Sequence, residues 1–92
     1  MHVDVIHTPE SSRFEARVEG QLCEADYELQ DGVMSLTHTR VPELLQGRGI
    51  AAALIHAALD HAAARGLKVR PLCSYARQYM QRHPETQTLL AA

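Results

Sequence analysis

The sequence is poor in aromatic side chains, with no tryptophan, one phenylalanine and three tyrosines among 92 residues. Proteins that bind nucleic acid combine a basic surface with aromatic rings that stack on bases. This chain has a pI of about 6.3 and a formal net charge of −2, which argues against a nucleic-acid partner. Apolar residues at 46% and charged residues at 22% are ordinary for a globular protein and argue against disorder.

Cysteine and long apolar runs are also scarce. Cys23 and Cys73 are far apart in the chain and no Cys-x-x-Cys pair is present, so we expect free thiols in a reducing compartment and no disulfide scaffold. The longest apolar run covers residues 50–55, whereas a membrane span needs about 18 residues. The N-terminus lacks the pattern of a secretory leader. We therefore expect a cytoplasmic protein without a membrane partner.

Charge is unevenly distributed along the chain. Residues 1–46 carry three arginines and nine acids, whereas residues 47–92 carry six basic residues and two acids. A basic half can hold phosphate groups and an acidic half can attract cations. An uneven surface without a function is the alternative interpretation.

Alternating apolar and polar residues predict strands in the first part of the chain. The clearest alternation covers residues 13–18. Residues 22–29 alternate less strictly, and residues 1–7 alternate weakly. Residues 33–41 are rich in Thr and Val and predict a further long strand. Tight turns separate these runs, one of them with the Asp-Gly pair typical of hairpins. The pattern predicts an antiparallel meander.

The pattern changes in the second part of the chain. Residues 50–65 are rich in alanine and predict a helix, which Gly66 ends at the usual position of a C-terminal glycine. Residues 68–72 predict a short strand, and Ser74 is a candidate N-cap for a helix over residues 75–82. The last eight residues are expected to form a frayed tail.

The predicted elements follow the order β-β-β-β-α-β-α. No repeat or linker divides the chain, so we expect a single domain over residues 1–92. This order predicts an α+β fold in which two helices pack against a mostly antiparallel sheet.

A loop with the sequence Gln46-Gly47-Arg48-Gly49 lies between the last strand of the meander and the long helix. Glycines let the backbone approach a ligand closely, and the free N–H groups of a first helical turn attract anions. Arg48 adds a positive charge. The loop therefore predicts a phosphate or pyrophosphate site.

Two known phosphate motifs fit this loop poorly. A P-loop needs a Lys followed by Ser or Thr, and no such pair is present. The dinucleotide fingerprint Gly-x-Gly-x-x-Gly/Ala matches Gly47, Gly49 and Ala52, but the acid that it requires about 20 residues later is missing.

The stretch Gln46-Gly47-Arg48-Gly49-Ile50-Ala51 resembles the Gln/Arg-x-x-Gly-x-Gly/Ala signature of the GNAT superfamily of acyl-CoA-dependent N-acetyltransferases. Its position, after a strand and at the start of an Ala-rich helix, is also typical of that family. The resemblance covers about residues 33–86 and extends to a subgroup of very small stand-alone GNAT-like proteins. The further stretches that carry it are Pro71-Leu72-Cys73-Ser74-Tyr75 and Arg82-His83-Pro84.

The resemblance implies a minimal GNAT-like fold that binds acetyl-CoA. Backbone N–H groups of the loop would hold the CoA pyrophosphate, and two diverging strands would admit the pantetheine arm. The parts of a full-length GNAT that usually build the acceptor pocket have no counterpart here, so the acceptor is implied only as a primary amine. The implied cofactor-binding residues are Thr39, Val41, Gln46, Gly47, Arg48, Gly49, Ile50, Ala51, Cys73 and Ser74.

Three residues are candidates for a direct role in acetyl transfer. Cys73 is either a nucleophile that forms an acetyl-cysteine or a buried cysteine at the end of a strand. His38 is either a base for the amine or for Cys73, or a surface histidine. GNAT enzymes often use a tyrosine of the second helix as the acid for the CoA thiol, so Tyr79 has either this role or a place in the core.

No metal site is indicated. His56 and His61 are five residues apart on the predicted helix, whereas helical zinc pairs are four apart with a glutamate beside the first. We interpret both histidines as part of a solvated face, with Asp60 as a partner for His56.

The sequence thus predicts an N-acetyltransferase that binds acetyl-CoA and acts, as a monomer or weak dimer, on an amine of a small molecule or a lysine side chain. One alternative is a non-catalytic CoA-binding or protein-interaction module with the same fold. Another is a thiol-reactive sensor built on Cys73.

Overall fold

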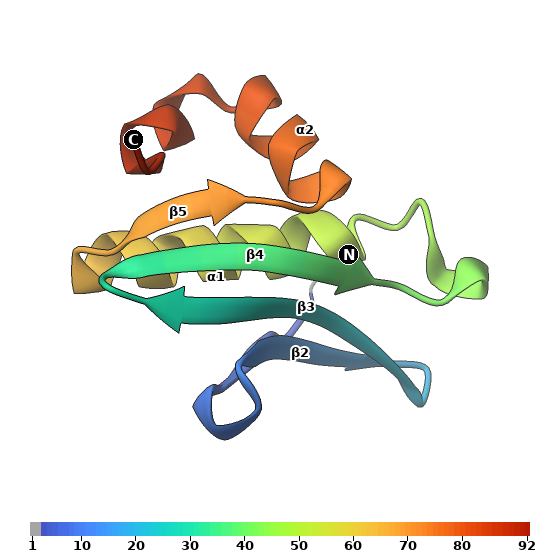
Figure 1. Ribbon diagram of the computed structural model, residues 1–92. Helices are drawn as coiled ribbons and strands as arrows, with labels where there is room; N and C mark the ends of the chain where they lie inside the picture. Colours follow the sequence, from blue (N-terminus) through green and yellow to red (C-terminus); the bar gives the residue numbers. More distant parts are fainter. Residues whose placement is uncertain (1–2) are drawn as a thin grey trace.

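A computed structural model describes residues 3–92, and this part of the chain forms five strands and two α-helices (Figure 1). None of its helices is both long enough and apolar enough to cross a bilayer. The observed order β-β-β-β-α-β-α confirms the predicted α+β fold. The elements are β1 (Ile6–Thr8), β2 (Arg13–Val18), β3 (Gln21–Gln30), β4 (Val33–Arg40), α1 (Ile50–Arg65), β5 (Lys68–Pro71) and α2 (Ser74–Arg82), with 3₁₀ turns η1 (Pro9–Ser11), η2 (Glu43–Leu45) and η3 (Pro84–Leu89).

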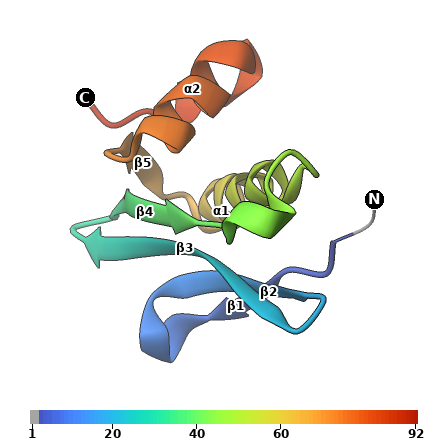
Figure 2. The ribbon, with the colours of Figure 1, turned by 90° about the vertical axis from the view of Figure 1, so that its right-hand side faces the viewer.

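The strands form one sheet in the order β1-β2-β3-β4-β5. Neighbours from β1 to β4 are antiparallel, whereas β4 and β5 are parallel. A parallel pair needs a crossover connection, and α1 provides it by running across one face of the sheet (Figures 1 and 2). Helix α2 follows β5 and packs against α1, β4 and β5.

The core lies between the sheet and α1. Alternation along the strands turns Phe14, Tyr27 and Leu36 toward the helix, and each is at most 6% exposed. Small alanines on the buried side of α1 let the helix approach the sheet closely, which supports the packing expected from the alanine-rich sequence. The buried residues of α1 are Ile50, Leu54, Ile55, Ala58, Leu59 and Ala62.

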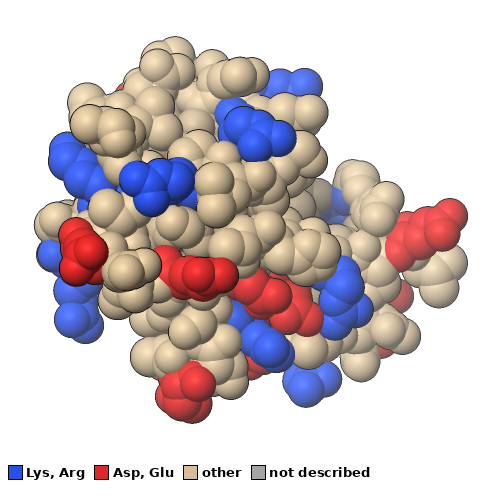
Figure 3. All heavy atoms as spheres, in the orientation of Figure 1, with Lys and Arg blue, Asp and Glu red and all other residues tan. Residues whose placement is uncertain are grey.

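The opposite face of the sheet carries charged side chains (Figure 3). Buried Glu24 accepts a hydrogen bond from Arg40 Nη2 at 2.7 Å and lies 3.5 Å from Arg13 Nε. The hydrogen bond from Arg40 is the main reason that the pKa of Glu24 lies below its ordinary value. The acidic first half of the chain therefore neutralises part of its charge within itself.

Two predicted boundaries near the ends of the sheet differ from the structure. The strand expected over residues 1–7 is observed as Ile6–Thr8, and Met1 and His2 lie outside the described residues. The N-cap of α2 is Cys73 rather than Ser74, because the sulfur of Cys73 accepts a hydrogen bond from the N–H of Ala76. Ser74 is the first residue of the helix instead.

The end of the chain is ordered rather than the frayed tail that its sequence suggests. After η3, Leu90 forms a parallel bridge with Val69 of β5, and the N–H of Ala91 donates to the carbonyl of Val69 at 2.9 Å. β5 is the last strand of the sheet, so its outer backbone groups are available for pairing. This long-range pairing leaves no local sequence pattern.

An aromatic and imidazole cluster fastens β1 to the rest of the fold. The ring of His7 stacks on Phe14 with 4.3 Å between centroids, and its Nε2 lies 2.7 Å from the hydroxyl of Tyr27. His61 of α1 approaches the same ring edge-on at 4.4 Å. Burial, followed by the neighbouring His61 and Arg65, lowers the pKa of His7.

Acidification should destabilise the fold through His7. Its pKa is lower in the folded protein than the unfolded value of about 6.5, so the unfolded chain binds the proton more readily. The stabilising contribution of neutral His7 is therefore present above about pH 6.5 and is lost as the pH falls below that value. Urea unfolding at pH values from about 7.5 to 5.5 measures how steeply the free energy of unfolding changes with pH. The slope should be smaller in His7→Gln, which cannot titrate, and an equal slope would contradict this role.

Candidate functional site

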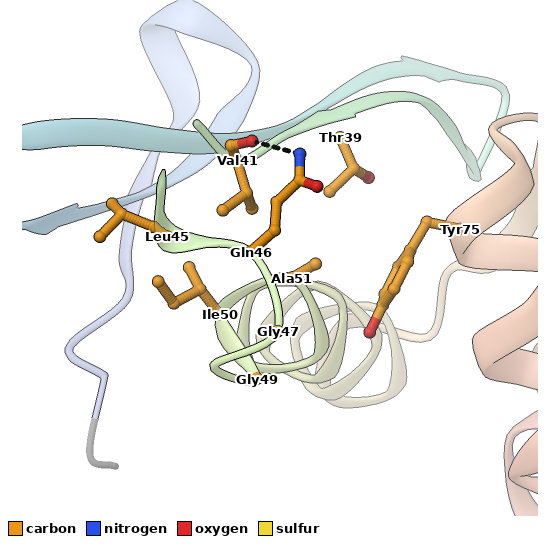
Figure 4. Close-up of a pocket in the computed structure, with 9 residues that line it drawn as sticks. All are labelled: Thr39, Val41, Leu45, Gln46, Gly47, Gly49, Ile50, Ala51 and Tyr75. Atoms are coloured by element: carbon orange, nitrogen blue, oxygen red, sulfur yellow. Dashed lines mark hydrogen bonds between the residues drawn. The ribbon is translucent and has the colours of Figure 1, made fainter. Parts of the chain in front are cut away.

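Two glycines in the left-handed conformation shape the loop between β4 and α1. Gly47 has φ 82° and Gly49 has φ 81°, a region that residues with a Cβ rarely adopt. A Cβ at either position would meet no non-neighbouring atom within 4 Å, so both glycines border open space. Gln46 Nε2 donates a hydrogen bond to the carbonyl of Val41 at 3.1 Å and fastens the loop to the end of β4 (Figure 4).

Helix α1 begins without a side-chain cap. Gly49 occupies the N-cap position, and the first turn contains no acidic residue. The first hydrogen bond of the helix runs from the N–H of Ala53 to the carbonyl of Gly49 at 3.1 Å. The N–H groups of Ile50, Ala51 and Ala52 precede this bond and have no acceptor within the helix. These donors and the positive end of the helix dipole favour an anion.

A cavity of about 350 Å³ lies directly beside this end of α1 (Figure 4). The end of β4, the loop and the first turn of α1 form most of its wall, and the ring of Tyr75 from α2 forms the remaining side (Figure 4). Seven of the ten residues that the sequence assigned to cofactor binding lie in this wall. The lining residues are Thr39, Val41, Leu45, Gln46, Gly47, Gly49, Ile50, Ala51 and Tyr75.

A β-bulge in β4 turns the end of that strand toward the cavity. Leu36 pairs with Tyr27 and His38 pairs with Asp26, so Thr37 is the extra residue. An extra residue reverses the alternation of the side chains that follow it. Thr39 therefore faces the cavity, although it lies an odd number of residues after the core residue Leu36.

Cys73 lies where β4 and β5 separate. The regular pairing of the two strands ends at Leu36 and Pro71, and the N–H of Cys73 donates to the carbonyl of Leu36 at 3.0 Å. Beyond this point the sulfur of Cys73 lies 3.3 Å from Thr39 Oγ1 and 3.4 Å from the N–H of Ala76. Cys73 thus contacts the cavity residue Thr39 and also caps α2, but it is not itself a lining residue.

Arg48 and Ser74 also lie outside the cavity wall. The guanidinium of Arg48 forms an ion pair with Glu19 in the turn between β2 and β3. Ser74 is exposed at the start of α2. The geometry therefore places the backbone of the predicted phosphate loop at the cavity, but not the side chain of its arginine.

The structure does not bring His38 to the cavity or to Cys73. His38 follows the bulge on the opposite face of the sheet, where it is exposed and pairs across strands with Asp26. The sulfur of Cys73 contacts Thr39 instead. Sequence spacing missed this separation because the bulge changes which residues share a face.

Tyr79 lines a second cavity, of about 500 Å³, between α1 and α2. Its hydroxyl lies 3.4 Å from His56 Nδ1, and His56 Nε2 pairs with Asp60 at 3.1 Å as the sequence suggested. Among residues 3–92, no three His, Cys, Asp or Glu side chains are grouped so that they could hold a metal ion. The lining residues are Gly49, Ala52, Ala53, His56, Tyr75, Gln78, Tyr79, Arg82 and His83.

Sequence reasoning missed Tyr75 and Leu45 as cavity residues. Tyr75 borders both cavities, which also share Gly49. Burial raises the pKa of Tyr75, so its hydroxyl stays protonated near neutral pH. The signal available in the sequence was the position of Tyr75 in the first turn of the second helix, close to the end of the preceding strand.

The family of the chain follows from its similarity to known proteins. A profile of the GCN5-related N-acetyltransferase family matches residues 13–89, so the chain belongs to that family. Protein NATD1 of Gallus gallus is 40% identical over 57 residues, which cover 62% of this chain and 52% of that protein. Protein NATD1 of Danio rerio is 38% identical over 56 residues, which cover 61% of this chain and 51% of that protein. The chain spans about half the length of the curated relatives it matches.

A solved structure supports the fold independently. The solution structure of a GCN5-like protein from Staphylococcus aureus superimposes with a TM-score of 0.76, covering 97% of this chain and 88% of that chain. Sequence identity between the two is 22%, so this likeness concerns the fold alone. The predicted GNAT-like architecture is confirmed.

Cys73→Ala should weaken α2. The substitution removes the side chain that accepts from the N–H of Ala76, and loss of an N-cap costs about 1 kcal/mol of unfolding free energy. Cys73→Ser keeps an acceptor at the same position, so its free energy of unfolding should fall clearly less. Urea unfolding of both variants tests this assignment, which fails if they lose the same stability.

Proposed function

We propose that this chain binds acetyl-CoA at the loop and first cavity and transfers the acetyl group to a primary amine. The observation that carries the proposal is the uncapped start of α1, which borders the cavity behind two left-handed glycines. Membership of the GCN5-related N-acetyltransferase family supports the same ligand.

The loop residues suit the pyrophosphate of CoA. An anion can approach the backbone of Gly47 and Gly49 closely, because no Cβ is present and the space beside both is open. The free N–H groups of Ile50 and Ala51 then donate hydrogen bonds to the negatively charged oxygens at the positive end of the helix dipole. Binding by backbone groups makes this subsite depend on conformation more than on any one side chain.

We assign the remaining parts of CoA to the two cavities, one part to each. Gly49, next to the proposed pyrophosphate position, borders both cavities, and the side chain of Tyr75 also borders both. The first cavity leads along Thr39 of β4 and Val41, which follows the strand, and suits the narrow pantetheine arm. The second contains aromatic rings and the guanidinium of Arg82, which suit a base and a phosphate group.

Acetyl-CoA supplies an activated acyl group as a thioester. Attack by a neutral amine forms the new C–N bond, breaks the C–S bond and transfers one proton from the amine, so that free CoA leaves as a thiol. Among residues 3–92, Tyr75 is the titratable residue in the wall of the first cavity, and its raised pKa keeps the hydroxyl available as a donor. We assign Tyr75, rather than Tyr79, to the leaving sulfur, because Tyr79 lies in the second cavity.

Direct attack by the amine fits this arrangement better than an acetyl-cysteine. A cysteine nucleophile needs a base, and the sulfur of Cys73 contacts Thr39 and a backbone N–H, with His38 on the other face of the sheet. We therefore assign Cys73 to support of the cavity wall.

A second candidate function is binding of CoA without turnover. Among residues 3–92, the wall of the first cavity contains no histidine and no carboxylate that could take the proton of an amine. This observation favours a binding module unless the acceptor arrives already neutral. Turnover on a panel of amines and lysine peptides distinguishes the two functions.

The proposal is tested by mixing the protein with acetyl-CoA and recording native and denaturing mass spectra. We expect a CoA-sized adduct in the native spectrum and no added acetyl mass after denaturation. An acetyl group that survives denaturation and maps to Cys73 would replace direct attack by a covalent step. No adduct at all would refute the ligand assignment.

Gly49→Leu should abolish tight binding of CoA without unfolding the protein. The side chain would enter the space needed by the ligand, and loss of one charge-assisted hydrogen bond alone weakens binding by roughly 10–100-fold. Gly32→Leu is the matched control, because Gly32 has φ 77° and equally open surroundings but lies in the turn between β3 and β4. Calorimetric titration with CoA should give a much lower affinity for Gly49→Leu than for Gly32→Leu. Equal affinities would contradict the assignment of the loop to CoA binding.

A further inference from the structure

The turn between β2 and β3 contains an unusual residue. Glu19 and Gly20 form its two central positions with φ 52° and 76°, and the strands pair up to the residues on either side. Turns of this kind favour Asn, Asp or Gly, because short side chains tolerate the left-handed conformation. The corresponding turn between β3 and β4 follows this preference with Asp31. A glutamate is a less favourable choice, and here its longer side chain reaches Arg48.

The ion pair with Glu19 determines where the Arg48 side chain lies. Arg48 stands between Gly47 and Gly49, whose flexible backbones restrict its direction little. Glu19 draws it toward β2, whereas α2 follows β5 on the other side of β4. Arg48 therefore lines neither cavity in the part of the chain that the structure describes.

We infer that the Glu19–Arg48 ion pair is a latch that keeps Arg48 off the phosphate site in the free protein. When CoA binds, Arg48 exchanges the carboxylate of Glu19 for a phosphate group. Glu19 thereby sets the affinity of the site without touching the ligand. This inference rests on the proposed function of the loop.

The charges favour such an exchange. The side chains of Glu19 and Arg48 are 61% and 37% exposed, and ion pairs at this exposure are weak and screened by salt. A phosphate group offers Arg48 a stronger, bidentate partner, next to the N–H groups of α1. Glu19 opposes binding in two ways, because it competes for the guanidinium and because it places a negative charge near an anion.

Glu19→Gln should tighten the binding of CoA by about threefold at low ionic strength, the value of a weak surface ion pair. Isothermal titration calorimetry with CoA measures the gain, which should shrink at high salt because the interaction is screened. Asp31→Asn is the matched control. It removes the same charge from the same kind of turn at the opposite end of the sheet, so its affinity should equal that of the unmodified protein (Figure 1).

The same substitution in an Arg48→Ala background separates the latch from a general effect of charge. Most of the gain should disappear there, since the carboxylate has no arginine left to hold and only its own repulsion of the anion remains. Unchanged or weaker binding in Glu19→Gln, or an equal gain without Arg48, would overturn the latch while leaving the CoA site intact. If the unmodified protein does not bind CoA, the proposed function falls and the latch falls with it.

Discussion

The parallel pairing of β4 with β5 is the constraint on which the rest of this structure depends. A parallel pair cannot be closed by a hairpin, so the chain must leave the end of β4, cross one face of the sheet as α1 and return to the start of β5. The start of α1 is thereby placed at the end of the sheet where β4 and β5 separate. An uncapped helix N-terminus and an opening between strands meet there without any dedicated binding segment.

Local backbone features then shape the site where the start of α1 lies beside the opening between β4 and β5. Gly47 and Gly49 hold the loop in conformations that keep its backbone accessible, and the hydrogen bond from Gln46 to Val41 fastens it to β4. The bulge at Thr37 turns Thr39 toward the cavity. The site is consequently formed largely from backbone groups and small side chains. Backbone N–H groups at such a position suit recognition of an anionic group.

The distribution of charge follows from the same architecture. One face of the sheet is covered by α1 and is apolar, whereas the other carries arginines and carboxylates that neutralise each other. The cation of the glycine loop is likewise paired with an acid of the nearest hairpin. Long-range attraction of an anion to this loop is therefore weaker than the basic second half of the chain suggests.

Much of the fold could be predicted because its signals are local. The alternation in residues 13–18 reflects a periodicity of neighbouring residues. The alanine-rich run that became Ile50–Arg65 reflects the helix propensity of the residues themselves. The glycine loop was also recognisable, because helix start, glycines and glutamine lie next to one another in the sequence. The sequence by itself thus determined the order of the elements, the fold class and the position of the loop.

Only the tertiary structure decided which side chains meet. A single extra residue in β4 placed Thr39 beside Cys73 and His38 on the far face. The turn at Glu19 reached across the sheet to Arg48, and the free edge of β5 took up the end of the chain. These contacts join residues that are distant along the chain, and their geometry depends on strand register and on which edge is open. Neither property is contained in the local pattern around any one of the residues.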